Sequence, residues 1–98
     1  MGKLINKDEH EDDYNRLMGF AQKHKAAKPK STHTQTFSGD VIKELVNDPN
    51  FGSLKIHHGV NDEGHRVLIL EALDTEGLAM NKVAGDAPTC PPTCPENT

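Results

Sequence analysis

The sequence predicts an α+β domain: a small antiparallel three-stranded meander packed against one or two helices, with flexible N- and C-terminal segments. Two observations carry this prediction. Residues 39–47 have apolar side chains at helical spacing, and residues 53–81 contain three apolar runs separated by two turn sequences. A helix followed by strand, turn, strand, turn and strand is expected to cover one face of the sheet.

The first element in chain order is a helix expected over residues 9–24. Its apolar side chains recur at helical spacing, at Tyr14, Leu17, Met18 and Ala21. Acidic residues precede this stripe and basic residues follow it, an order that matches the helix dipole. Because the stripe is narrow, the helix is expected to dock on the sheet, pair with a copy of itself or fray. Residues 28–32 have the composition of a linker.

The second helix is expected over residues 39–47, and its ends are well marked. Ser38 is placed to accept a hydrogen bond from a free amide of the first turn, and Asp40 complements the positive end of the dipole. Phe37 and Ile42 have the spacing of a hydrophobic staple. Pro49 disfavours helical geometry at the residue before it, so the helix is expected to end there.

Three strands are expected over residues 53–60, 65–73 and 78–81. Residues 62–64 supply a short hairpin loop ending in a glycine, with Asn61 opposite His65, and residues 74–77 repeat this turn chemistry. This register assigns one set of side chains to the face that meets the helix: Leu54, Ile56, His58, Val60, Arg66, Leu68, Leu70 and Ala72.

The opposite face of the sheet is expected to carry His57, His65, Val67, Ile69 and Glu71. Val67 and Ile69, together with Leu73, leave this second face partly apolar. Exposed apolar patches commonly mark interfaces. We therefore predict an interface at Val67, Ile69 and Leu73, covered by the N-terminal helix, the C-terminal tail or another chain.

The composition limits the size of the core. Apolar residues make up 34% of the chain and Trp is absent, so a domain of this length is marginal, and self-association or a protein partner would help to stabilise it. Three regions are expected: residues 1–34 as the N-terminal helix and a partly flexible linker, residues 35–82 as the α+β core, and residues 83–98 as an irregular tail containing Cys and Pro.

The charge pattern argues against nucleic acid as a partner. Residues 1–36 hold seven basic and five acidic side chains, residues 37–80 hold three and eight, and residues 81–98 hold one and two. The folded centre is thus acidic, whereas phosphate contacts need Lys and Arg. The chain also lacks an apolar run long enough for a membrane span and an N-terminal apolar segment typical of a signal peptide, so we expect a cytoplasmic protein.

Cys90 and Cys94 form the most distinctive local pattern, within residues 89–95. The prolines between them favour an extended chain, which would hold the two Cα atoms about 12 Å apart, whereas a disulfide needs about 4.4 to 6.8 Å. A disulfide would therefore require a turn, and a cytoplasmic thiol pool would oppose it. Reduced, unbound thiols are the expectation, so no cofactor is expected.

Zinc is the alternative role for the two cysteines. Cys90 and Cys94 could combine with His57 and His65, which the expected register places on one face of the sheet. No nucleophile elbow, identifiable catalytic acid or glycine-rich phosphate loop accompanies the histidines. We therefore expect a protein that is not an enzyme.

The sequence resembles two groups of proteins. The FSGDVI helix start, the apolar hairpin and the C-terminal CPPTCP motif resemble a family of small hypothetical bacterial proteins without assigned activity. This resemblance implies a bacterial cytoplasmic protein and no mechanism. The helix, the hairpin and a following segment with Thr and Cys are also similar to precursors of modified ribosomal peptides. In that case the modification sites would be Thr89, Cys90, Thr93, Cys94 and Thr98.

The function expected from the sequence is a small non-catalytic module that binds another protein or itself. A zinc-stapled structural domain and a precursor of a modified peptide are the alternatives.

Overall fold

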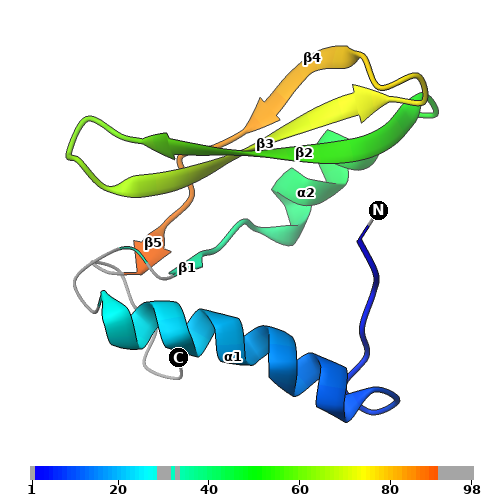
Figure 1. Ribbon diagram of the computed structural model, residues 1–98. Coiled ribbons are helices and arrows are strands. Elements are labelled where there is room, and N and C mark those ends of the chain that lie inside the picture. Colours follow the sequence, from blue (N-terminus) through cyan, green and yellow to red (C-terminus); the bar gives the residue numbers. More distant parts are fainter. Residues whose placement is uncertain (1, 29–31, 33, 91–98) are drawn as a thin grey trace.

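The computed structural model describes residues 2–28, 32 and 34–90 and has the predicted α+β class. Its elements in chain order are α1 (Glu11–Ala27), β1 (Thr34–Gln35), α2 (Gly39–Val46), β2 (Phe51–Val60), β3 (Arg66–Asp74), β4 (Ala79–Ala84) and β5 (Thr89–Cys90). Strands β2, β3 and β4 form an antiparallel meander, and β1 pairs with β5 in a separate two-stranded sheet. In Figure 1 the meander lies above α2, and α1 lies on the far side of the two-stranded sheet.

Helix α2 begins as the sequence predicts. The Ser38 side chain accepts a hydrogen bond from the Val41 amide at 3.3 Å, and Asp40 lies in the first turn. The helix ends at Val46, and the carboxylate of Asp48 then accepts a hydrogen bond from the Asn50 amide. This short side-chain turn leads the chain directly into β2.

The register of the first hairpin is confirmed. Leu54 faces Ala72, His58 faces Leu68, and the Asn61 amide donates to the His65 carbonyl at 2.9 Å. Gly64 has a φ of 82°, which a glycine adopts without steric cost. The continuous register from Ser53 to Val60 fixes which side chains share a face.

The second loop of the meander has the same pattern of hydrogen bonds as the first. The side chain of Asp74 accepts from the amides of Glu76 and Leu78, as Asn61 does from Glu63 and His65 in the first loop. Gly77 has a φ of 83°. Two Asx turns of one geometry therefore connect the three strands.

The core lies between α2 and the central part of the sheet. Its buried members are Leu45, Leu70, Ala72 and Ala84. Five half-buried side chains pack around them: Phe37, Ile42, Val46, Phe51 and Met80. Thus the face carrying Leu70 and Ala72 meets the helix, as predicted. One partly exposed ion pair, Lys82 to Asp48 at 3.8 Å, joins β4 to the end of the helix.

The structure extends the ordered core beyond the predicted boundary at residue 82. Strand β4 continues to Ala84, which is buried, and Thr89 and Cys90 pair with Gln35 and Thr34. The first part of the tail expected to be irregular is therefore β-structure. Strand β4 contains a bulge, since its register against β3 shifts and Asn81 has a φ of 59°.

Helix α1 is confirmed with ends shifted from the predicted residues 9–24. Glu11, Asp12 and Asp13 lie in its first turn, and His24 and Lys25 in its last. None of its side chains is buried, and Leu17, Met18 and Phe20 remain exposed. Within the described residues, the helix is not docked on the meander by its apolar stripe.

Replacing Leu45 by Ala is expected to lower the free energy of unfolding by about 3 kcal/mol, because it leaves a cavity between α2 and the sheet. Urea denaturation followed by circular dichroism measures the change. Leu78→Ala is the matched control, since Leu78 is exposed, and it should cost less than about 0.5 kcal/mol. Equal losses for the two variants would show that the core lies elsewhere.

Candidate functional site

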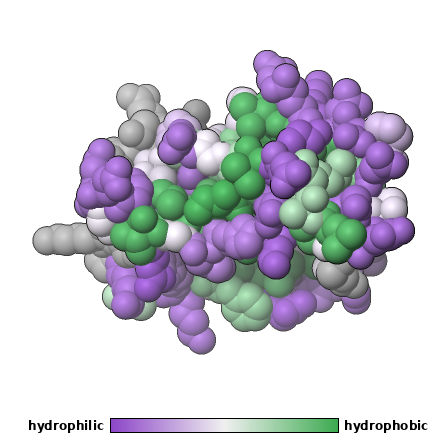
Figure 2. Space-filling model, turned by 90° about the horizontal axis from the view of Figure 1, so that it is seen from above, coloured by the Kyte–Doolittle hydropathy of each residue, from purple (hydrophilic) through white to green (hydrophobic). Residues whose placement is uncertain are grey.

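The outer face of the meander, opposite α2, carries the predicted interface residues. The register places Val67, Ile69 and Leu73 on this face, with Val83 of β4 beside them opposite Glu71. The first three are half-buried, whereas Val83 is 64% exposed. Figure 2 looks onto this side of the molecule and shows apolar surface running across it between polar side chains. Apolar surface is thus present on the side of the meander that faces away from α2.

His57 and Glu71 form the main polar contact on this face. They come from β2 and β3, and His57 Nε2 lies 2.8 Å from Glu71 Oε1. Both side chains are partly open to solvent. Because one ring nitrogen of His57 is taken up by the carboxylate, the contact fixes the ring across the two strands.

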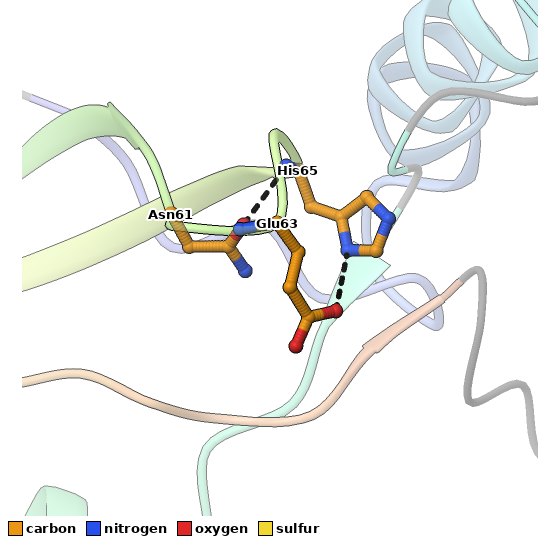
Figure 3. Close-up of polar contacts among 3 residues, drawn as sticks. All are labelled: Asn61, Glu63 and His65. Atoms are coloured by element: carbon orange, nitrogen blue, oxygen red, sulfur yellow. Dashed lines mark hydrogen bonds and ion pairs between the residues drawn. The ribbon is translucent and has the colours of Figure 1, made fainter.

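His65 lies at the hairpin loop and has local contacts. Its amide donates to Asn61 Oδ1 at 2.9 Å, and its Nδ1 atom lies 3.8 Å from Glu63 Oε2. Figure 3 shows these three side chains gathered at the loop. The arrangement closes the turn and supplies a weak, exposed ion pair when the imidazole is protonated.

Among the described members of the predicted zinc site, Cys90, His57 and His65 are not grouped around one point. Cys90 lies in β5, in the two-stranded sheet, whereas His57 and His65 lie on the meander and at its loop. Within residues 2–28, 32 and 34–90, no three His, Cys, Asp or Glu side chains are grouped so as to hold a metal ion. Cys94 lies outside the described residues.

Cys90 also departs from the expectation of reduced thiols, because it is disulfide-bonded. A sulfur in a disulfide is not a thiolate and cannot serve as a zinc ligand in that state. Of the candidate modification sites, Thr89 and Cys90 lie in β5, and Thr93, Cys94 and Thr98 lie outside the described residues.

The inner face of β2 is exposed where the sequence predicted contact with the helix. Leu54, Ile56 and Val60 are 37%, 53% and 69% exposed. The reason is length: α2 spans about 12 Å and lies against β3 and β4, whereas β2 is about 33 Å long. A helix of eight residues cannot cover this strand. The difference between the two lengths could have been predicted from the sequence.

A pocket of about 730 Å³ lies between the hairpin, β1 and the end of α1. Its polar lining includes His24, Gln35, His58 and Arg66. No sequence pattern points to Gln35, yet its Oε1 accepts from the Leu68 amide at 2.6 Å and its Nε2 donates to the Ala87 carbonyl at 3.2 Å. Gln35 thus joins the two-stranded sheet to the edge of β3.

No protein-family model, curated protein or solved structure matches this chain. The resemblance to a bacterial family therefore stays a prediction. Among the described residues, no helix has both the length and the apolar character needed to cross a membrane.

Replacing Gln35 by Ala is expected to remove both hydrogen bonds and lower the free energy of unfolding by about 1 to 2 kcal/mol, since the half-buried Leu68 amide loses its acceptor. The Leu68 amide hydrogen should also exchange at least tenfold faster, which exchange spectroscopy measures. Gln22→Ala on the exposed surface of α1 is the control. Unchanged exchange at Leu68 would contradict the linking role of Gln35.

Proposed function

We propose that this protein is a small non-catalytic module that binds another protein or a second copy of itself. The observation that supports it is the apolar surface of the meander, on the outer face at Val67, Ile69 and Leu73 and on the inner side of β2. A domain with this few buried side chains gains stability from covering such surface.

The chemistry of the outer face favours binding over catalysis. The shorter of the two described histidine–carboxylate contacts, His57 with Glu71, lies on an open surface and not in a cleft that would exclude water. On β3, the apolar side chains of Ile69 and Leu73 flank Glu71 on the same face. An apolar patch with a polar contact at its side is the composition of a protein interface.

The acidic centre of the chain supports a protein partner rather than nucleic acid, because residues 37–80 carry a net charge of −5 from three basic and eight acidic side chains.

A cytoplasmic location is part of the same proposal. The disulfide at Cys90 weighs against it, since cytoplasmic thiols are kept reduced.

The test combines light scattering of the purified protein with titration of isotope-labelled protein by cell extract. We expect either a mass above that of the monomer or selective shifts of the Val67, Ile69 and Val83 signals. Val83→Lys should weaken binding of an extract component at least tenfold, because it places a charge in the apolar patch. Leu78→Lys, also exposed but in the second loop, should leave it unchanged.

An inert monomer in both measurements would overturn the proposed function. Loss of binding in Leu78→Lys but not in Val83→Lys would refute the outer face as the binding surface.

A further inference from the structure

The outer edge of β2 is the longest unpaired edge in the described part of the chain. In the meander, β2 lies at the border and pairs only with β3. Because Asn61 bonds the His65 carbonyl, the alternation of an antiparallel ladder directs the main-chain groups of Lys55, His57 and Gly59 toward β3. Those of the even-numbered residues Leu54, Ile56, His58 and Val60 therefore point away from it.

An independent contact confirms this alternation. The Leu68 amide, opposite His58, bonds Gln35 and so is directed away from β2. His58 and Leu68 are therefore a pair without mutual hydrogen bonds, as the ladder requires. The main-chain N–H and C=O groups on the outer edge of β2 therefore alternate regularly, and no described strand lies beside them.

Proteins commonly protect such edges with charges, prolines or bulges. Over Leu54–Val60, β2 has one fixed charge, Lys55, no proline and no register shift, since the irregularity lies between Phe51 and Ser53. The side chains of Leu54, Ile56 and Val60 along this edge are exposed as well. The edge is thus open to another strand in both its main chain and its side chains.

We propose that β2 pairs antiparallel with β2 of a second copy, about a two-fold axis at His57, joining two meanders into one continuous sheet. This inference rests on the self-associating form of the proposed function. Two features of the β2 edge favour a strand of the same sequence as its partner. They are the side chains that lie opposite each other across the pair and the position of the single charge.

The axis at His57 overlaps the whole stretch from Leu54 to Val60 with its copy. Leu54 then lies opposite Val60 and Ile56 opposite His58, so exposed apolar side chains of the two copies meet on the inner face at the two Leu54–Val60 pairs. Lys55 lies opposite Gly59, where it meets no charge. An axis at Lys55 would instead place the two lysines opposite each other, which is destabilising.

Amide hydrogen exchange at increasing protein concentration tests the pairing. In the monomer, the amides of Leu54, Ile56, His58 and Val60 should exchange rapidly, whereas those of Lys55, His57 and Gly59 are protected by β3. We expect the even-numbered amides to become at least tenfold more protected as light scattering reports the dimer. Even-numbered amides that stay unprotected at every concentration would overturn the proposal.

A matched pair of variants separates this proposal from the proposed function. Ile56→Lys should weaken dimerisation at least tenfold, and Val60→Lys should do the same, while Val83→Lys on the outer face should leave the dimer intact. Dispersed signals from Leu70 and Ala84 would verify that each variant is folded. A dimer broken by Val83→Lys but not by Ile56→Lys would overturn pairing through β2 and leave the proposed function standing.

A wild-type protein that stays monomeric yet binds an extract component would likewise refute only the β2 pairing. A monomer that binds nothing would remove both proposals.

Discussion

The contact of Leu45 with the buried side chains of the sheet determines the rest of this structure. Leu45 is 4% exposed and packs with Leu70, Ala72 and Ala84. Because these partners lie on β3 and β4, the helix is drawn to that side of the meander and away from β2. Burial of apolar surface is the main favourable term in folding, and here a short helix supplies it over only part of one sheet face.

This limited coverage explains the remaining surfaces. The outer face has no helix over its apolar side chains in the described chain, and the inner side of β2 extends past the end of α2. A larger protein would cover both with further elements. In a chain of 98 residues with 34% apolar residues, association with another chain can serve the same purpose.

Local chemistry made much of the fold predictable. The Ser38 cap, the turn residues Asn61 and Gly64 and the strict alternation in β2 each specify geometry over a few residues, and the register followed from them. The pairing of Thr89 and Cys90 with β1 was not predictable, because it joins distant segments of polar composition. The outer-face residues could be assigned from alternation, whereas the role of Gln35 depends on tertiary position and has no sequence signal.

The repeated loop geometry also bears on how the chain folds. Both connections in the meander close through hydrogen bonds among neighbouring residues, so each hairpin can form with little loss of loop entropy. The β1–β5 pairing instead brings together segments that flank the entire α2 and meander region. Pairing of two distant segments loses less chain entropy once the structure between them has formed. We therefore expect the meander to form early and the two-stranded sheet to form last.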